Sequence, residues 1–549
     1  MYGTIIVGGG SAGCVLAHRL SARSGHRVLL CEAGRDIAPG CAPEDIADWY
    51  WVPAYLNPAY HWPELRAVAT EGSAPRKYEQ ARVMGGGSAI NALMANRGSP
   101  EDYQEWVRRG ARGWGWDDVL PYFRKLERDM DCDGPLHGKE GRIPVSRVFP
   151  PAWSGHAQAL AEAWRAAGYE FLPDQNGEFR DGYFAIAFSG AYERRVSAAM
   201  GYLDAATRQR ENLEIATDTH VTGLLFEGRR CVGVRTAGGE LRANEVILAA
   251  GAIHSPAILL RAGIGPSDEL QGLGISILAA SPRVGKGLMD HPALSISAYV
   301  KPHARLNAAA RRHAVVALRF SSMPGAPASD MIAIVATKST WHAVGELIGS
   351  VLVVLYKPFS ESGDVRLSSA DWRAEPEVRF NLLSDPRDLE RMMASVRWAA
   401  RLHDTPALRA VTSDPFAAFY SQRIRKYFAV NRRNRIVMNG LARLVDGPAA
   451  LRRALIHRVM SEAPPVRELL EDDESCAAFV RKAATGIWHA SCTCRMGSVT
   501  DAEGRVLGVE GLRVADASIF PVAPRANINF PVMMAAEKIA DAILRGSPA

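Results

Sequence analysis

The chain has no hydrophobic run long enough to cross a membrane. Apolar residues make up 48% of its 549 residues, but polar and charged residues interrupt them throughout, and a bilayer-spanning helix needs about 20 consecutive residues that are mostly apolar. The short apolar stretch TIIV near the start is followed at once by glycines, with no basic leader and no cleavage site. We therefore expect a buried first strand and not a signal peptide.

Cysteine is scarce and scattered. The eight cysteines form no C-x-x-C pair, so the sequence has neither the dense spacing of a disulfide scaffold nor the paired ligands of a structural zinc or iron–sulfur site. Reduced thiols, a cytoplasmic location and no bound metal are the expectations.

A strong excess of one charge is missing too. Basic residues outnumber acidic ones by six, and no basic run is interleaved with aromatic residues. Nucleic-acid binding therefore has little support, whereas a mild positive field suits an anionic cofactor or substrate.

What the sequence does contain begins with a strand–helix–strand pattern. Residues 4–7 are a β-branched run, residues 11–21 are typical of a helix, and residues 27–31 (RVLLC) form a second buried strand. This order predicts a βαβ unit at the start of a parallel sheet. Further along, we expect short antiparallel strands from residue 212 and a last helix over about 531–545.

Gly8, Gly10 and Gly13 form the pattern G-x-G-x-x-G directly after the first strand. In a dinucleotide-binding turn the first glycine permits the tight turn, the second lets a pyrophosphate approach the backbone, and the third allows close helix–strand packing. Glu32 follows 19 residues after Gly13, where an acid accepts ribose hydroxyls and disfavours a 2′-phosphate. These features favour dinucleotide binding over a plain glycine turn, but they do not distinguish NAD from FAD.

Three further segments closely resemble the signature segments of the glucose–methanol–choline (GMC) oxidoreductases, which are FAD-dependent. They are YEQARVMGGGSAIN (78–91), GAIHSPAILLRAGIGP (251–266) and LRVADASIFPVAPRANINFPVMMAAEKIAD (512–541). With the N-terminal glycines and WHASCTCRMG, the resemblance runs from residue 4 to residue 541. Within the family the chain looks most like the bacterial oxidases of small aromatic or heteroaromatic primary alcohols, the hydroxymethylfurfural oxidase and aryl-alcohol oxidase type.

The resemblance implies an α/β fold, α+β overall, in two domains. We expect a Rossmann-like, discontinuous FAD-binding domain made of residues 1–150, 190–294 and 481–549. We expect a substrate-binding domain, residues 151–189 and 295–480, built on a mostly antiparallel sheet plus helices.

The resemblance also implies how FAD is bound. The residues expected to contact it are Gly8, Gly10, Ser11, Ala12, Gly13, Glu32, Ala33, Gly86, Gly87, Ser88, Asn91, Met94, Val221, Ala250, Gly251, Trp488, Asp516, Ala517 and Phe530. A covalent flavin link in the family commonly uses a histidine just before the Asn of the GGGSAIN-type loop. Here that residue is Ile90, so non-covalent FAD is expected.

The expected chemistry needs a base. An alcohol gives hydride to flavin N5 readily only while its hydroxyl proton is being removed. The family places a histidine at the position of His489, and its second catalytic position, His or Asn in different members, matches Asn527. We expect His489 to take the proton and Asn527 to hold the substrate oxygen, with Asn529 a rival for that role, and we assign no chemistry to His254 or His291.

The stretch WHASCTC, residues 488–494, also raises a metal site or a cysteine nucleophile as alternatives. Neither has support, because no second ligand pair exists and nothing marks a base for Cys492. The family commonly has Gly where this chain has Cys492, and we expect Cys492 simply to pack. Trp488 and Trp62 are either walls of an aromatic substrate pocket or ordinary core residues.

The favoured function is FAD-dependent oxidation of a small aromatic or heteroaromatic primary alcohol to the aldehyde, with the reduced FAD reoxidised by O2 or another acceptor. A choline-type or aliphatic alcohol dehydrogenase with a non-oxygen acceptor is one alternative, and a hydroxynitrile-type lyase on the same flavin fold is another. A flavin-binding protein without catalysis and a nicotinamide-dependent dehydrogenase fit the motifs less well. Neither the particular alcohol nor the oligomeric state follows from the sequence.

Overall fold

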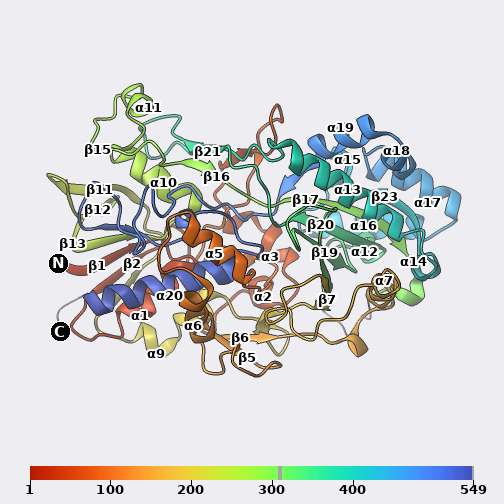
Figure 1. Cartoon of the computed structure of the whole chain (residues 1–549), viewed down its shortest axis with the longest axis horizontal. Coiled ribbons are helices and arrows are strands. Elements are labelled where there is room, and N and C mark those ends of the chain that lie inside the picture. Colours follow the sequence, from red (N-terminus) through yellow and green to blue (C-terminus); the bar gives the residue numbers. More distant parts are fainter. Residues whose placement is uncertain (307–311, 547–549) are drawn as a thin grey trace.

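Two large sheets lie at opposite ends of the long axis of the molecule (Figure 1). The structure is a computed structural model, and it describes residues 1–306 and 312–546. The first sheet holds the N-terminal strands, and the second is built from the middle of the chain.

The first sheet is parallel at its centre. β1 pairs in parallel with β2 and β13, β2 with β10, and β13 with β25. An antiparallel ladder of β11 and β12 continues from β13. The strands are β1 (Tyr2–Val7), β2 (Val28–Cys31), β10 (Leu213–Ala216), β11 (Val221–Glu227), β12 (Arg230–Thr236), β13 (Gly239–Leu248) and β25 (Leu512–Val514).

The predicted βαβ unit is confirmed as β1, α1 (Ser11–Leu20) and β2. The prediction of antiparallel strands from residue 212 is correct for β11 and β12 and wrong for β10, which joins the parallel edge beside β2. The sequence of this four-residue strand does not indicate which strand it pairs with, because its partner β2 lies almost 200 residues earlier in the chain.

Glycines allow α1 to begin directly against β1. Gly8 has a φ of +106°, and a Cβ on Gly13 would lie 1.9 Å from the carbonyl oxygen of Gly8, so no larger residue fits without moving the backbone. α1 packs beside the last helix, α20 (Asn529–Gly546), which begins two residues before the predicted start (Figure 1). The helix that follows the turn after β1 is therefore packed against the C-terminal helix.

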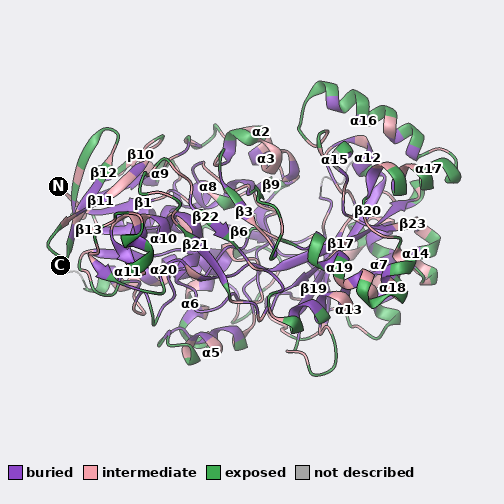
Figure 2. Cartoon of the chain, turned by 90° about the horizontal axis from the view of Figure 1, so that it is seen from above, coloured by how far each residue is buried: buried purple, intermediate pink, exposed green. Residues whose placement is uncertain are grey.

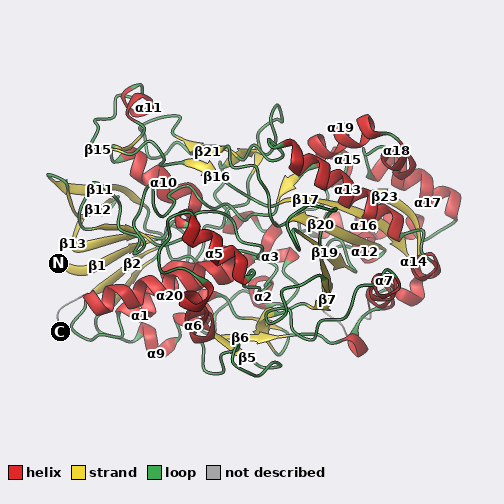
Figure 3. Ribbon diagram, in the orientation of Figure 1, coloured by secondary structure: helices red, strands yellow, loops and turns green. Residues whose placement is uncertain are grey.

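The second sheet is antiparallel throughout, with strand order β23–β17–β20–β19–β18–β7. Its strands are β7 (Gly182–Ala185), β17 (Pro292–Val300), β18 (Val316–Phe320), β19 (Met331–Ala336), β20 (Ile348–Leu355) and β23 (Thr412–Ala417). The predicted mostly antiparallel sheet is confirmed. Helix α13 (Pro386–Leu402) packs on β17 and β20, and α19 (Asp473–Ala483) packs on α13 (Figure 3).

A smaller sheet joins segments from both predicted domains. Its order is β16–β21–β22–β3–β4. The strands are β3 (Arg66–Val68), β4 (Arg76–Lys77), β16 (Lys286–Leu288), β21 (Gly363–Arg366) and β22 (Glu377–Arg379). The exact domain boundaries therefore stay a prediction, although β7 in the second sheet supports placing residues 151–189 in the substrate domain.

The buried residues run continuously from one large sheet to the other, while the outer helices such as α16 (Arg432–Val445) are largely exposed (Figure 2). Within residues 1–306 and 312–546, every helix is too short or too polar to span a bilayer.

Candidate active site

A cavity of about 710 Å³ lies between the two large sheets. Its walls include Val7, Cys31 and Ala249, at the carboxyl ends of the parallel strands, and Ile334 and Leu352 from the antiparallel sheet. The carboxyl ends of parallel strands are where α/β folds bind nucleotides, and the size suits a cofactor or ligand site.

The cavity gathers most of the residues proposed from the sequence. Those that line it are Gly8, Gly10, Ser11, Ala12, Glu32, Ala33, Gly86, Gly87, Asn91, Met94, Val221, Ala250, Gly251, Trp488, His489, Asp516, Ala517 and Asn527. Gly13, Ser88 and Phe530 do not line it. Gly13 serves the packing of α1 on β1, Phe530 is fully buried in α20, and Ser88 binds its own loop by donating to the carbonyl of Gly85.

The N-terminus of α1 forms an anion cradle. Gly10 precedes the helix without any side-chain cap, and the first turn carries no acid. A Cβ on Gly10 would have no protein atom within 3.8 Å, its nearest neighbour being the carbonyl oxygen of Ala249 at 3.9 Å, so the backbone there is open to the cavity. Uncapped N–H groups and the helix dipole favour a pyrophosphate at this point.

Glu32 shapes the loop beside this cradle. Its two carboxylate oxygens accept N–H groups from Gly9 and Gly34, each at 2.8 Å. Burial raises the pKa of Glu32, and those two N–H donors oppose the rise. The carboxylate keeps further lone pairs toward the cavity, which fits its expected role with ribose hydroxyls.

Asp516 joins two more parts of the cradle. Its carboxylate accepts the N–H of Gly251 at 2.9 Å and the hydroxyl of Ser255 at 2.6 Å, and it also accepts from Ser518. Gly251 begins α10 (Gly251–Arg261), so Asp516 fixes a second helix start at the cavity wall.

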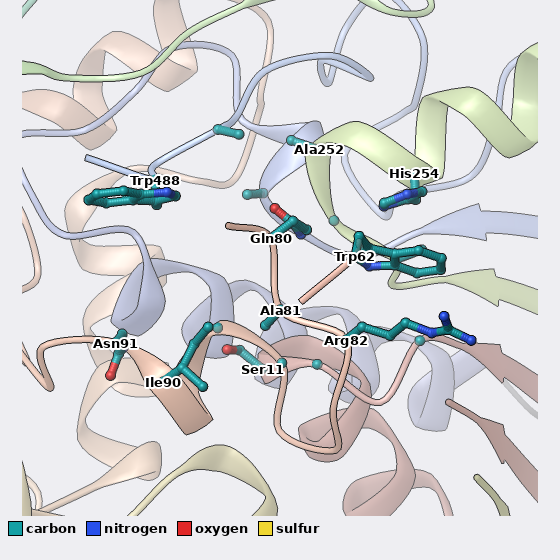
Figure 4. A pocket seen from close by; sticks show the side chains of 18 of the residues that line it. Ser11, Trp62, Gln80, Ala81, Arg82, Ile90, Asn91, Ala252, His254 and Trp488 are labelled. Atoms are coloured by element: carbon teal, nitrogen blue, oxygen red, sulfur yellow. The ribbon is translucent and has the colours of Figure 1, made fainter. Parts of the chain in front are cut away.

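Trp62 and His254 line the end of the cavity that lies opposite Trp488 (Figure 4). Trp62 lies on His254, with ring centroids 4.3 Å apart, and Arg82 lies over Trp62 at 4.9 Å. Figure 4 shows these side chains at the opposite end from Trp488. Trp62 and Trp488 therefore line opposite ends of the same cavity.

His489 is buried in the loop that follows β24 (Thr485–Gly486). Asp290 holds that loop, because its Oδ1 accepts the backbone N–H groups of His291, Ile487 and His489 at 2.7, 3.2 and 3.0 Å. Burial raises the pKa of the Asp290 carboxyl to about 7, against the effect of these donors. The catalytic candidate is thus positioned by a buried carboxyl that anchors its backbone.

The imidazole of His489 has a partner on each nitrogen. Nε2 lies 3.1 Å from Nδ2 of Asn527, and Nδ1 lies 2.8 Å from Nδ1 of His291. Since the amide Nδ2 only donates, Nε2 must be the unprotonated acceptor, and the proton of neutral His489 then sits on Nδ1 and is donated to His291. Burial, and secondarily the neighbouring His291, hold the pKa of His489 well below its ordinary value, so a neutral base faces the cavity.

His291, to which the sequence analysis assigns no chemistry, contacts the imidazole of His489 directly. Asp290 holds the loop backbone and His291 contacts the His489 imidazole, but they lie 199 and 198 residues before His489 in the sequence. Only the folded chain shows that they meet.

Asn527 is held in a defined orientation. The hydroxyl of Tyr356 donates to Asn527 Oδ1 at 2.6 Å, and the Asn527 N–H donates to Asn96 Oδ1 at 3.0 Å. These bonds turn Nδ2 toward His489. Asn529 has another partner, since its Oδ1 accepts the hydroxyl of Ser11 at 2.7 Å.

The two cysteines after His489 are fully buried. Burial raises the pKa of the Cys492 thiol to about 11 and also raises that of Cys494. A protonated thiol is neither a good nucleophile nor a metal ligand. Cys492 has a φ of +76°, a conformation that glycine adopts without strain, and this gives a physical reason for the glycine that the family commonly has there.

An uncapped helix start, a carboxylate for ribose hydroxyls, and a neutral histidine beside a fixed amide meet in one cavity. This combination points to a class of protein, an enzyme with a dinucleotide cofactor.

Comparison with known proteins identifies the family. Two family models described as GMC oxidoreductase match residues 2–293 and 358–536. The chain is 42% identical to 5-(hydroxymethyl)furfural oxidase of Methylovorus sp. (strain MP688) over 99% of both chains, and 32% identical to the mitochondrial choline dehydrogenase of Homo sapiens, covering 100% of this chain and 90% of that one. Its fold matches pyridoxine 4-oxidase from Mesorbium loti with a TM-score of 0.83 and 26% identity over the whole of both chains.

The chain belongs to the GMC oxidoreductase family, which confirms the resemblance seen in the sequence. It is a flavin-dependent oxidoreductase, and the flavoenzymes of this family bind FAD.

Proposed function

We propose that this enzyme oxidises a small aromatic or heteroaromatic primary alcohol to the aldehyde with FAD as the redox cofactor. The observation that carries the proposal is the pair of His489 and Asn527, which present an unprotonated Nε2 and an amide N–H2 to the same cavity. The relative named as a hydroxymethylfurfural oxidase supports the heteroaromatic substrate class.

The cavity residues fit FAD. The open N-terminus of α1 would hold the pyrophosphate, Glu32 the ribose, and the glycines at 86 and 87 a flat ring system. When bound, FAD takes up the hydride that leaves the carbinol carbon. Ile90 lines the cavity at the position where a histidine would be needed for a covalent link, so we propose non-covalent binding.

His489 and Asn527 divide the work on the substrate hydroxyl. An alcohol oxygen placed against both groups replaces their direct contact, donating its proton to Nε2 of His489 and accepting a hydrogen bond from Nδ2 of Asn527. As the proton moves to His489, the amide stabilises the negative charge that develops on the oxygen. Tyr356 and His291 keep the two groups in this alignment.

Aromatic side chains line the cavity next to this pair. Tyr55 packs edge-on against Trp488, with ring centroids 4.9 Å apart, and Trp51 packs against Tyr55 at 5.5 Å. Flat aromatic alcohols suit such walls. The choline dehydrogenases among the relatives make a quaternary ammonium alcohol the second candidate, since aromatic rings also bind cations, but the buried cation of Arg312 in the same walls disfavours it.

The test is anaerobic reduction of the purified protein. Yellow protein with flavin that is released by acid or heat, bleached by furfuryl or benzyl alcohol without air, is the expected result. Yellow protein that no alcohol bleaches but that cleaves a cyanohydrin would favour the lyase, and bleaching by choline alone would favour the second candidate. Peroxide formation, measured beside reduction of an artificial acceptor, separates an oxidase from a dehydrogenase.

We further propose that the enzyme works in the cytoplasm. All eight cysteines carry free thiols and six of them are fully or nearly fully buried, which suits a reducing compartment.

A further inference from the structure

Arg312 is a buried cation in the cavity wall. It lies just before β18 and is 5% exposed. Its Nη1 donates to the carbonyl of Trp49 at 2.9 Å and its Nη2 to the carbonyl of Ala92 at 3.1 Å. The guanidinium carbon lies 3.3 Å from the ring centroid of Phe188. Backbone carbonyls and an aromatic face therefore hold the group flat and in one place.

This guanidinium has no carboxylate partner among the described residues. Burial lowers its pKa, the cation of Arg195 adds to that effect, and the charge of Asp48 opposes it. An arginine nevertheless stays protonated at neutral pH. A buried charge without a counter-ion is costly, and two of its five N–H donors are used in the hydrogen bonds above.

The surroundings of Arg312 belong to the substrate side of the cavity. The neighbouring His313 accepts the indole N–H of Trp51 at 3.2 Å, and Trp51 leads through Tyr55 to Trp488, beside the proposed base. Burial lowers the pKa of His313 to about 3, so it carries no charge. Glu79, an acid in the cavity wall on this side, accepts a hydrogen bond from the indole of Trp488 at 3.3 Å, and burial raises the pKa of Glu79.

A second arginine shows what distinguishes Arg312. Arg319, in β18, also donates to two backbone carbonyls, those of Glu178 at 2.6 Å and Gln175 at 3.1 Å, and its guanidinium lies 5.1 Å from the ring of Phe184. Arg319 does not line the cavity, whereas Arg312 does. Both guanidinium groups are therefore buried on backbone carbonyls, and contact with the cavity distinguishes Arg312 from Arg319.

We propose that Arg312 makes the substrate end of the cavity an anion-binding subsite, so that the enzyme selects aryl-methanol substrates that carry a carboxylate away from the reacting alcohol. This inference rests on the proposed alcohol oxidation. A carboxylate forms charge-assisted hydrogen bonds with a guanidinium, and its charge offsets the burial of the Arg312 cation. The aromatic walls accept the ring between the two polar ends.

The experiment compares a matched pair of substrates, benzyl alcohol and 4-(hydroxymethyl)benzoate, by kcat/KM. The wild-type enzyme should prefer the carboxylate. Arg312→Gln should lower that preference roughly 10- to 100-fold, the size of one charged hydrogen bond in a buried site, and Arg312→Lys should lower it less. Arg319→Gln is the control for loss of a buried arginine and should leave the preference as it is.

Binding of benzoate and benzamide to the oxidised protein, followed by the flavin difference spectrum, gives a second measurement that needs no turnover. Benzoate should bind more tightly than benzamide, and Arg312→Gln should remove the difference. Equal preference for both substrates in the wild type, or an equal loss for both in Arg312→Gln, would overturn the proposal. If no alcohol bleaches the flavin while benzoate binding still depends on Arg312, the proposed reaction fails and the anion subsite stands.

Discussion

Tyr356 is the residue whose change most finely probes how the site is aligned. Its hydroxyl donates to Asn527 Oδ1 at 2.6 Å and lies 3.4 Å from Asn96 Nδ2. Tyr356→Phe removes only the oxygen and leaves the buried Asn527 carbonyl without that donor. An unsatisfied buried acceptor costs about 1–3 kcal/mol, and the amide avoids this cost by rotating Nδ2 away from His489.

Holding the amide in its productive orientation then costs the same amount during the reaction. We therefore expect the flavin reduction rate of Tyr356→Phe to fall about 5- to 150-fold. The assay is anaerobic stopped-flow reduction at saturating alcohol, with the absorbance of oxidised flavin as the signal. Bound FAD per chain should not change, because Tyr356 does not line the cavity.

Tyr202→Phe is the matched control. Tyr202 is also fully buried, and its hydroxyl donates to Glu537 at 2.8 Å, away from Asn527. It should lower the melting temperature without slowing reduction. If Tyr356→Phe reduces its flavin at the wild-type rate, Tyr356 does not set the orientation of Asn527 and the reasoning is refuted.

Two more predictions follow from the same loop. Cys492→Gly should be about 1 kcal/mol more stable than Cys492→Ala in thermal unfolding, because both lose the thiol but only glycine is relaxed at a φ of +76°; the usual order, with Ala more stable, would show that the strain is absent. Burial holds the pKa of His489 well below its ordinary value, so its neutral, proton-accepting form persists as the pH falls. The anaerobic reduction rate should then show no decline at pH 6.5, the ordinary pKa of histidine; a rate halved near pH 6.5 or above would contradict this.

The parts of the fold that sequence reasoning predicted rest on local signals. The β1–α1–β2 unit follows from a β-branched run, Gly8 and Gly13 at a forced turn, and a second buried strand. These residues contact neighbours only a few positions away, so the sequence pattern alone indicates the local structure. The order of the domains came from the family resemblance instead.

The parts that could not be predicted depend on contacts between distant segments. Asp290 and His291 meet His489 across almost 200 residues, and Tyr356 meets Asn527 across 171. No periodicity marks such pairs. Arg312 was one arginine among many until the fold placed it in the cavity wall without a carboxylate partner among the described residues.

The choice between the two asparagines of NIN shows what the sequence could predict and what only the fold could show. The sequence offers Asn527 and Asn529, separated by one residue, and the resemblance to the family favours Asn527. In the folded chain the side chain of Asn527 reaches His489, while that of Asn529 reaches Ser11 at the start of α1. This arrangement supports Asn527 as the group that holds the substrate oxygen.

The central claim is that His489 takes the proton of the alcohol, and its most direct test is the anaerobic reduction rate of His489→Ala. Loss of a positioned general base should slow reduction by about 100- to 10,000-fold. FAD should stay bound at the wild-type ratio, because its cradle at α1, Glu32 and Asp516 is untouched. A flavin that is still bleached by the alcohol at the wild-type rate would contradict the account.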